Sequence, residues 1–485
     1  MRSKAFIRLL LTLFYFLPNT LLAEKYSSIW PQDKLECAKN VLQNVLDKSD
    51  YSKAKLYAES CGDAALFDFI KLQKILGTRA RELDYFEVKK SYNYFQYYPG
   101  YTSFKLQLFR SIKDPLELQD AYQNFSLEWK KDSEIYNIIA ELFLDQEISE
   151  FHLNDFQDLL KKTWLFSKLN KSKTIKFYQK YQQYISNDDV KEKISLLLWR
   201  EDTSTASSLL KYVDSEYKQY YDIREAFRED SKTALSGLNK IPTEYHFDEG
   251  LFYDIVWWFQ RRNQDSKIPK YLVALPSKLS NPEIWYKIRI LNSRYLLEEG
   301  KYDDAYAILQ DHQVAPGSIE YAELEWLAGW ISLEYLKKPN LAVQHFMKLS
   351  DNASYPISTS RARYWLGRAY KDLNNDLMSV GWFEKASAYS TTFYGQMALM
   401  ELQDNFSIKL PELVLPDPKQ MVKVLTKDKI ARLGLYLKYS GYKSLAKGYL
   451  KRSIQNNQSR ESTYNVIALA EYSKDYVLAN DLAKY

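Results

Sequence analysis

The stretch that decides the fold is SRARYWLGRAYKDLNNDLMSVGWFEKASAYSTTFYGQMALMEL, residues 360–402. Apolar residues recur in its first part at i, i+3, i+4, i+7, i+8 and i+11, which places them on one stripe of a helix: Ala362, Trp365, Leu366, Ala369, Tyr370 and Leu373. The polar break Asn374-Asn375-Asp376 suits a helix exit and a new N-cap, so a second helix over 377–388 is expected to fold back along the first. A third helix is expected from Thr391-Thr392. Such a unit needs neighbouring helices to cover its apolar sides.

Similar units precede this stretch. Residues 295–306 have the form helix, Gly300 turn, helix, and Ala305 is small enough to let the second helix approach the first. Equivalent small residues are expected at Ala305, Ala342 and Gly381, separated by 37 and 39 residues. This spacing predicts an α-solenoid of helical hairpins that resemble tetratricopeptide units.

The composition agrees with an all-α fold. The chain has 485 residues with only 14 Gly and 14 Pro, well below the usual shares of about 7% and 5%. Proline falls mostly between the apolar segments, where it does not interrupt a helix. The 41 Tyr and 11 Trp are expected to fill helix contacts or grooves.

The first residues are typical of an export signal. Arg2, Lys4 and Arg8 precede an uncharged apolar run at 9–17, and we place the cleavage after Ala23. An uncleaved membrane anchor is the weaker alternative, because the run is shorter than the roughly 20 residues that a spanning helix needs. The signal peptide would thus be residues 1–23, and the mature protein would lie outside the cytoplasm.

The charge of the chain does not indicate a nucleic-acid partner. The formal net charge is +5, and removal of the three basic residues of the signal leaves a value near +2. The lysine-rich runs at 161–162 and 171–176 are expected to be solvated helix ends. A contribution to the attraction of an anionic polymer is the weaker interpretation.

The only two cysteines are Cys37 and Cys61. A helical hairpin with its turn near residue 49 would place them opposite each other, so in an oxidising compartment they could form a disulfide. The alternative is two free thiols that pack as small apolar groups. Their spacing favours neither a redox motif nor a zinc site.

Two pieces of the opening stretch carry a family resemblance. Tyr364-Trp365-Leu366-Gly367-Arg368-Ala369, followed by Phe393-Tyr394-Gly395-Gln396, resembles the end of the superhelical domain of the soluble lytic murein transglycosylases. These enzymes cleave the glycan strands of bacterial peptidoglycan. Trp257-Trp258-Phe259 followed by Gln260-Arg261-Arg262 resembles a further signature of the family, although as a pattern it predicts only an aromatic helix face with an exposed basic end.

The resemblance implies a domain organisation. Residues 24–402 would form the superhelical (U-type) domain, and residues 403–485 the helical linker (L-type) domain that closes a curved or ring-shaped superhelix. The boundary would fall at the densest proline cluster of the chain, Pro411, Pro416 and Pro418.

The family's lysozyme-like catalytic domain is not found in this sequence. It carries a Glu-Ser motif with Gly-Leu-Met-Gln downstream, in which a protonated glutamic acid donates to the glycosidic oxygen. The dipeptides Glu59-Ser60 and Glu461-Ser462 lack any such continuation, so we interpret them as chance matches. No catalytic residue can therefore be assigned, and we expect no turnover from this chain alone.

No other chemistry is indicated. The four histidines are scattered, none has His or carboxylate partners at metal-ligand spacing, and we expect surface or groove-edge positions for them: His152, His246, His312 and His345. There is no glycine-rich phosphate loop and no Gly-x-Ser-x-Gly elbow. We therefore predict no metal and no cofactor.

The sequence thus predicts a periplasmic superhelical module that is involved in peptidoglycan binding or turnover. Its partners would be glycan strands or a periplasmic wall enzyme. The rival hypothesis is a helical-repeat scaffold for interactions between periplasmic proteins, with no affinity for peptidoglycan. A third is an enzyme whose C-terminal part was lost through a frameshift or a stop codon.

Overall fold

The computed structural model describes residues 29–146, 148, 155–353, 355–403, 416–457, 459–472 and 475–483. Within these ranges the regular structure is α-helix with short 3-10 turns, and no strand is present. The all-α, helical-repeat class that the sequence predicts is therefore confirmed. The expected signal peptide, residues 1–23, lies outside the described residues. None of the described helices is long and apolar enough to cross a membrane.

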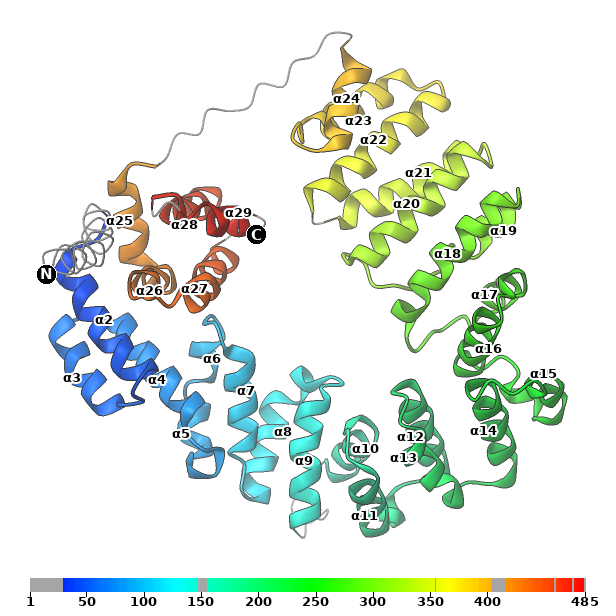
Figure 1. Cartoon of the computed structure of the whole chain (residues 1–485), viewed down its shortest axis with the longest axis horizontal. Helices are drawn as coiled ribbons and strands as arrows, with labels where there is room; N and C mark the ends of the chain where they lie inside the picture. Colours follow the sequence, from blue (N-terminus) through cyan, green and yellow to red (C-terminus); the bar gives the residue numbers. More distant parts are fainter. Residues whose placement is uncertain are drawn as a thin grey trace, which may run out of the picture. The chain divides into compact units, whose positions relative to one another are not determined.

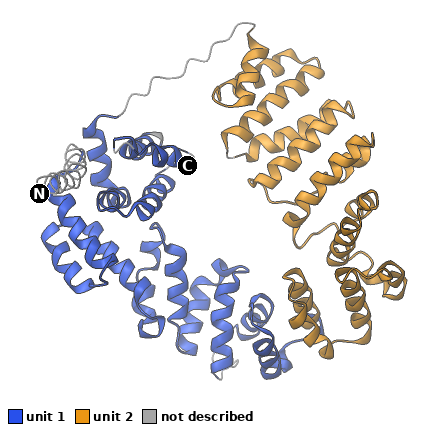
Figure 2. Ribbon diagram, in the orientation of Figure 1, with its two compact units in different colours: residues 1–189, 412–485 blue, residues 190–411 orange. Residues whose placement is uncertain are grey.

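The chain divides into two compact units, which are coloured separately in Figure 2. Unit 1 comprises residues 1–189 together with 412–485, and unit 2 comprises residues 190–411. The first and last parts of the chain therefore belong to one unit. The division into a superhelical domain and a linker domain near residue 402 stays a prediction.

The N-terminal part of unit 1 is a series of short helices that pack on helices nearby in the sequence; α2, α3 and α4 lie side by side in Figure 1, and α7 packs on both α4 and α9. In chain order the helices are α2 (Gln32–Leu46), α3 (Tyr51–Cys61), α4 (Ala64–Gly77), α5 (Tyr85–Lys89), α6 (Tyr92–Phe95), α7 (Tyr101–Arg110), α8 (Pro115–Trp129), α9 (Ser133–Asp145), α10 (Phe156–Phe166) and α11 (Lys171–Tyr181).

The C-terminal part of unit 1 consists of α25 (Pro418–Lys427), α26 (Lys429–Tyr439), α27 (Lys443–Asn456), α28 (Arg460–Tyr472) and α29 (Tyr476–Leu482). Helix α26 packs on α2 and α4, so the end of the chain is covered by its beginning. Nearly all of the side chains of α26 between Ile430 and Leu437 are buried by this contact and by α27. The stability of each segment thus depends on the other.

Helix α12 (Asn187–Trp199) spans the division between the units. Unit 2 continues with α13 (Thr203–Leu209), α14 (Ser215–Arg228), α15 (Ala234–Gly237), α16 (Glu249–Arg261), α17 (Pro269–Val273), α18 (Trp285–Glu298), α19 (Tyr302–Ala307), α20 (Ile319–Glu334), α21 (Pro339–Asn352), α22 (Pro356–Asp372), α23 (Asp376–Ser387) and α24 (Phe393–Leu402). The 3-10 turns of the chain are Ala80–Glu82, Gln182–Tyr184, Leu210–Tyr212, Leu238–Lys240, Thr243–Tyr245, Asp265–Lys267 and Pro282–Ile284.

The helix boundaries follow from local chemistry. Asp114 accepts hydrogen bonds from the backbone N–H groups of the first turn of α8, and Asp132 does the same for α9. Asn375 caps α23 and Thr392 caps α24, at the positions that the polar break and the two threonines predict. Gly300 has a φ of 73°, the left-handed conformation expected at the turn between α18 and α19.

Three hairpins of unit 2 repeat at a constant spacing, but the prediction that Gly381 is equivalent to Ala305 and Ala342 is wrong. Ala305, Ala342 and Ser379 each occupy the fourth position of the second helix of a hairpin, are buried, and are separated by 37 residues in each case. A Cβ built on Gly381 would meet no atom within 4 Å, so that glycine serves no close contact. The small residue at the contact is Ser379, whose hydroxyl donates to Gly367 O at 2.9 Å.

The close approach of paired helices depends on two glycines of the first helices. A Cβ on Gly329 would lie 2.6 Å from the ring of Phe346, and a Cβ on Gly367 would lie 2.6 Å from the ring of Phe383. Phe346 and Phe383 are themselves buried and 37 residues apart. Each hairpin therefore inserts one phenyl ring against a glycine on the preceding helix.

Candidate binding sites

Unit 1 contains a pocket of about 840 Å³ between the loop that follows α6 and helices α25 to α28. We call it the tyrosine pocket, because Tyr94, Tyr97 and Tyr98 form one wall. Tyr94 and Tyr97 are 45% and 55% exposed, so part of each ring is open to solvent. The rest of the lining includes amides, lysines and two acidic residues: Asn456, Asn457, Lys423, Lys427, Lys429, Asp428 and Glu461.

A carboxylate behind the wall holds two of the tyrosines. Asp68 Oδ2 accepts from Tyr94 OH at 2.6 Å and from Tyr98 OH at 2.9 Å. Lys429 Nζ lies 3.0 Å from the same oxygen and 3.1 Å from Tyr94 OH. Burial, the hydrogen bond with Tyr94 and the charge of Asp68 raise the pKa of Tyr98, so its phenol remains a donor. The wall is therefore fixed in place.

The main chain beside Tyr97 anchors the C-terminal helices. Tyr97 O accepts from Arg452 Nε at 3.3 Å and from Asn456 Nδ2 at 2.8 Å, and Arg452 also donates to Gln96 O. The side chain of Tyr97 remains half exposed at the mouth of the pocket. Its ring is thus presented on a fixed backbone, which is the arrangement that a stacking contact with a ligand requires.

The tyrosine pocket exists because the two ends of unit 1 are joined by a buried ion pair. Arg432 donates from Nε and Nη2 to the two oxygens of Asp63, at 2.9 Å each. Tyr436 OH donates to Asp63 Oδ2 at 2.7 Å, and Trp30 Nε1 donates to Tyr436 OH at 3.0 Å. We call these four residues the terminal interface. Burial by itself would raise the pKa of Asp63, but the hydrogen bonds from Arg432 and Tyr436 lower it below its usual value.

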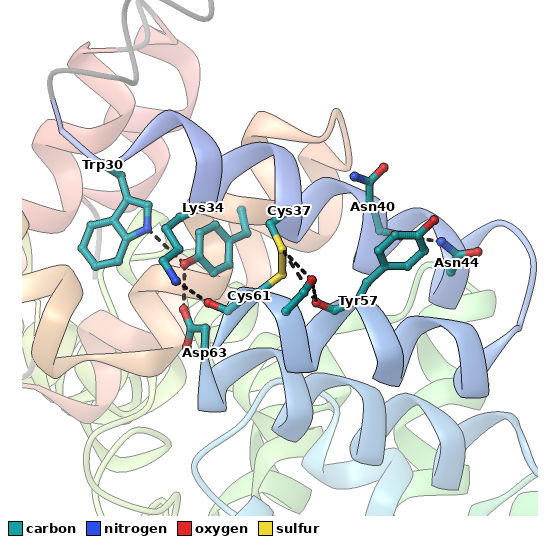
Figure 3. The surroundings of a disulfide bond; sticks show 10 residues. Trp30, Lys34, Cys37, Asn40, Asn44, Tyr57, Cys61 and Asp63 are labelled. Carbon is teal, nitrogen blue, oxygen red and sulfur yellow. Dashed lines mark hydrogen bonds between the residues drawn. A yellow bond between two sulfur atoms is a disulfide. The ribbon is translucent and has the colours of Figure 1, made fainter.

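Next to the terminal interface, a disulfide bond joins Cys37 of α2 to Cys61 of α3, with 5.8 Å between their Cα atoms (Figure 3). The two helices run antiparallel from the turn at Ser49, so the cysteines lie directly opposite each other. Lys34 also bonds across the hairpin, to the carbonyl oxygen of Cys61. Because Asp63 follows Cys61 by two residues, the bond fixes the segment that presents Asp63 to Arg432.

Unit 2 contains a second pocket, of about 690 Å³, which we call the histidine pocket. His312, Glu325 and His345 lie on its wall and are all buried. Glu325 Oε2 lies 2.6 Å from His345 Nδ1, and Glu325 Oε1 lies 3.4 Å from His312 Nε2. Of the expected surface or groove-edge positions, a surface position is wrong for these two buried histidines, which lie on a pocket wall and have a carboxylate partner. Spacing along the chain did not reveal the contact because the three residues come from a loop and from two different helices.

The hydrogen bonds define the protonation of this cluster. Val314 N–H donates to His312 Nδ1 at 3.0 Å, so that nitrogen carries no proton and Nε2–H faces Glu325. His345 Nε2 lies 3.0 Å from Tyr306 OH. Burial would raise the pKa of Glu325, but hydrogen bonds with the two imidazoles and the charge of Lys348 lower it to about 2. Glu325 is therefore a carboxylate, the opposite of the protonated acid that glycoside cleavage needs.

The remaining residues singled out in the sequence have structural roles. Arg262 stacks over the ring of Trp258 at 4.1 Å and donates to Asp230 O at 2.9 Å, so this basic helix end is tied to the loop after α14. Glu59-Ser60 lies on the exposed face of α3. Glu461-Ser462 borders the tyrosine pocket, but Glu461 is exposed in the first turn of α28 and nothing desolvates it.

The other expected solvated groups are placed as follows. In the first lysine-rich run, Lys161 pairs with Asp189 and Lys162 with Asp158, but both lie in the middle of α10, so the expected helix-end position is wrong for them. His246 is partly buried, 3.2 Å from Ile241 O, and His152 lies outside the described residues. No group of three or more acidic, histidine or cysteine side chains in the described part of the chain is arranged to hold a metal ion.

The fold defines an all-α helical-repeat protein, with two pockets of mixed polar and apolar lining. No family model matches the sequence, and a comparison with curated proteins gave no match. Among solved structures, one match is described as "Circular tandem repeat protein with novel repeat topology and enhanced subunit contact surfaces". It is 11% identical, has a TM-score of 0.11, and the match covers 96% of this chain and 95% of that one. A TM-score this low does not indicate a shared fold, so the all-α helical-repeat class is assigned from the arrangement of the helices themselves.

Proposed function

We propose that the protein is a periplasmic peptidoglycan-binding module of helical repeats, and that the tyrosine pocket receives a segment of a glycan strand. The observation that carries this proposal is the composition of the pocket: exposed tyrosine rings together with side-chain amides and lysines. The faces of sugar rings present C–H groups that pack on aromatic rings, and their hydroxyl groups bond to amides. The volume of about 840 Å³ suits an oligosaccharide segment better than a single small ion.

The lining of the pocket carries three lysines and two acidic residues, Asp428 and Glu461, and this small excess of positive charge supports an acidic partner. Lys423 and Lys427 are exposed, and the described residues offer neither of them an acidic partner within ion-pair distance. Peptidoglycan carries carboxylates on its sugar ethers and on its peptides, so both lysines would gain partners from the polymer. The attraction would be weakened by salt, because exposed charges are screened over about 10 Å at 0.1 M.

The resemblance of residues 364–369 and 393–396 to the superhelical domain of soluble lytic transglycosylases supports the same substrate class. In the structure these segments have packing roles. Gly367 lies against the ring of Phe383, and Thr392 is the N-cap of α24, whose second residue is Tyr394. They would therefore shape the repeat rather than touch the polymer. We expect binding, and no release of anhydro-muropeptides, from the 485-residue chain.

Sedimentation with purified sacculi tests the proposal. The chain should pellet with the sacculi at low ionic strength, and the bound fraction should fall as salt is raised. Glycan strands freed of their peptides should compete with the sacculi for binding. A chain that remains wholly in the supernatant at low salt would contradict wall binding, and release of anhydro-muropeptides would contradict the absence of turnover.

The alternative, a scaffold for periplasmic proteins, is favoured by one specific observation. Helix α23 exposes Leu377, Met378 and Val380 to solvent, with exposed fractions of 85%, 38% and 46%. Three apolar side chains close together on one short helix are a common feature of protein contacts. Absence of sacculus binding would leave this alternative as the better account.

A further inference from the structure

The histidine pocket contains a buried cation that no carboxylate neutralises. Arg289 of α18 lines the pocket and is only 3% exposed. Its Nη1 donates to Ile308 O, while its Nε is buried and has no hydrogen-bond partner within the described protein. Burial lowers the pKa of Arg289 to about 10, so the guanidinium remains charged at neutral pH.

The other buried arginines of the described residues are paired. Arg224 donates to Asp254 at 2.6 Å, and Arg432 donates to Asp63 at 2.9 Å from two nitrogens. A buried charge without a partner is costly, and a native protein usually retains one only where a ligand or a function requires it. Arg289 is the exception, and it lines the histidine pocket.

The acidic groups of the pocket do not satisfy Arg289. Glu325 is already engaged by His312 and His345, and Lys348 lies 3.8 Å from it. Asp311 is exposed in a left-handed turn at the pocket mouth; it acts on Arg289 through its charge but makes no ion pair with it. The guanidinium therefore has no acidic partner in the described part of the chain, and it belongs to the lining of the pocket that an anion would enter.

The rest of the wall indicates what else such a ligand carries. Leu272, Val273, Leu275 and Val314 contribute apolar surface, and the volume of about 690 Å³ is in the range of small-molecule sites. Glu325 and Asp311 would repel a dianion more strongly than a monoanion. These features favour a single carboxylate on an apolar body over an inorganic phosphate.

We propose that the histidine pocket binds the terminal carboxylate of a short apolar peptide, with Arg289 as the group that holds the carboxylate. This site lies in unit 2 and is independent of the proposed glycan contact in unit 1. The protein would then recognise two chemical classes at two separate places.

Isothermal titration calorimetry with Ala-Ala-Ala as the probe tests the proposal on the full chain. We expect the free tripeptide to bind at least tenfold more tightly than its C-terminal amide, and more tightly than inorganic phosphate. Arg289→Gln should reduce the affinity at least tenfold. Because that variant alters a buried residue, Val273→Glu provides a second test at a 58% exposed position on the rim, with Val273→Gln as its neutral control.

Val273→Glu should weaken binding by charge repulsion, and Val273→Gln should leave it near the wild-type value. The proposal is overturned if the tripeptide does not bind the wild-type chain at millimolar concentration, if the amide binds equally well, or if phosphate binds more tightly. Failure of sacculus binding would leave these results unaffected, since the two experiments report on different pockets.

Discussion

The two pockets differ in how the chain builds them. The histidine pocket draws its residues from consecutive hairpins between positions 272 and 348, so it is a local product of the repeat. The tyrosine pocket combines residues 93–98 with residues 420–462, so it exists only while the two ends of unit 1 hold together. Repeat proteins make sites of the first kind readily because each repeat contacts its neighbours. A site of the second kind depends on one interface.

Breaking the terminal interface should have the largest effect, and it should disrupt the tyrosine pocket while leaving the histidine pocket intact. Asp63→Ala leaves Arg432 buried without its acid, which costs about 3–5 kcal/mol of stability in unit 1. Limited proteolysis should then cut the C-terminal helices α26 to α29 much faster than in the wild type. Glu59→Ala, on the exposed face of α3, is the matched control and should change little. Unchanged proteolysis of Asp63→Ala would contradict the role of the terminal interface.

Loss of the disulfide should destabilise only unit 1. The bond closes a loop with a sequence separation of 24 residues, and such a loop contributes about 3 kcal/mol in the chain-entropy model. A Cys37→Ser, Cys61→Ser variant should show a lower unfolding temperature for unit 1, measured by calorimetry. Unit 2 has no cysteine, so its transition serves as the internal control. An equal shift of the unfolding temperatures of both units would contradict the claim that the disulfide stabilises unit 1 alone.

The histidine pocket should show its own dependence on pH. The pKa of Glu325 falls from 4.5 to about 2 on folding, so its ionised form stabilises unit 2 at pH values above about 4.5. That contribution is lost as the pH falls from about 4.5 towards 2. Glu325→Gln should cost about 1–3 kcal/mol at pH 7, because it weakens two buried hydrogen bonds. Chemical denaturation of the wild type and of Glu325→Gln at several pH values should show that the difference between their free energies of unfolding becomes smaller as the pH falls below about 4.5. A difference that does not change with pH would contradict the proposed stabilisation by ionised Glu325.

A pair of glycine substitutions sharpens the account of the repeat itself. Gly367→Ala places a methyl group 2.6 Å from the ring of Phe383 and should destabilise unit 2 by about 1–3 kcal/mol. Gly381→Ala meets nothing within 4 Å and should stabilise α23 by about 0.5–1 kcal/mol, as Ala does in a helix interior. Denaturant melts of both variants check the signs. If Gly381→Ala is destabilising, the sequence prediction that Gly381 lies at a close contact between two helices would be supported after all.

Sequence periodicity predicted the features that depend on neighbouring residues. The hairpin at 360–402, its caps at Asn375 and Thr392, and the turn at Gly300 all follow from spacing and from local backbone chemistry. The error at Gly381 has a physical origin, because a small residue marks a close approach only when it faces the partner helix. Ser379, two positions earlier, faces it and Gly381 does not.

Contacts between distant residues could not be predicted in this way. Asp63 and Arg432 are 369 positions apart, and no helical period relates them. The histidine cluster was missed because Glu325 lies on the inner side of α20 while its partners come from a loop and from α21. One weak signal was present: Glu325 is an acidic residue between the apolar residues Leu324 and Trp326 of α20.

The central claim, that the tyrosine pocket holds a glycan strand, is tested most directly by one exposed ring. Tyr97→Ala removes a side chain that is 55% exposed in the pocket, and Tyr476→Ala removes one that is 62% exposed on α29, outside it. An aromatic contact of about 1–1.5 kcal/mol corresponds to about a tenfold change in affinity. Sedimentation with purified sacculi should show this loss for Tyr97→Ala and wild-type binding for Tyr476→Ala. Equal binding by both variants would contradict the account.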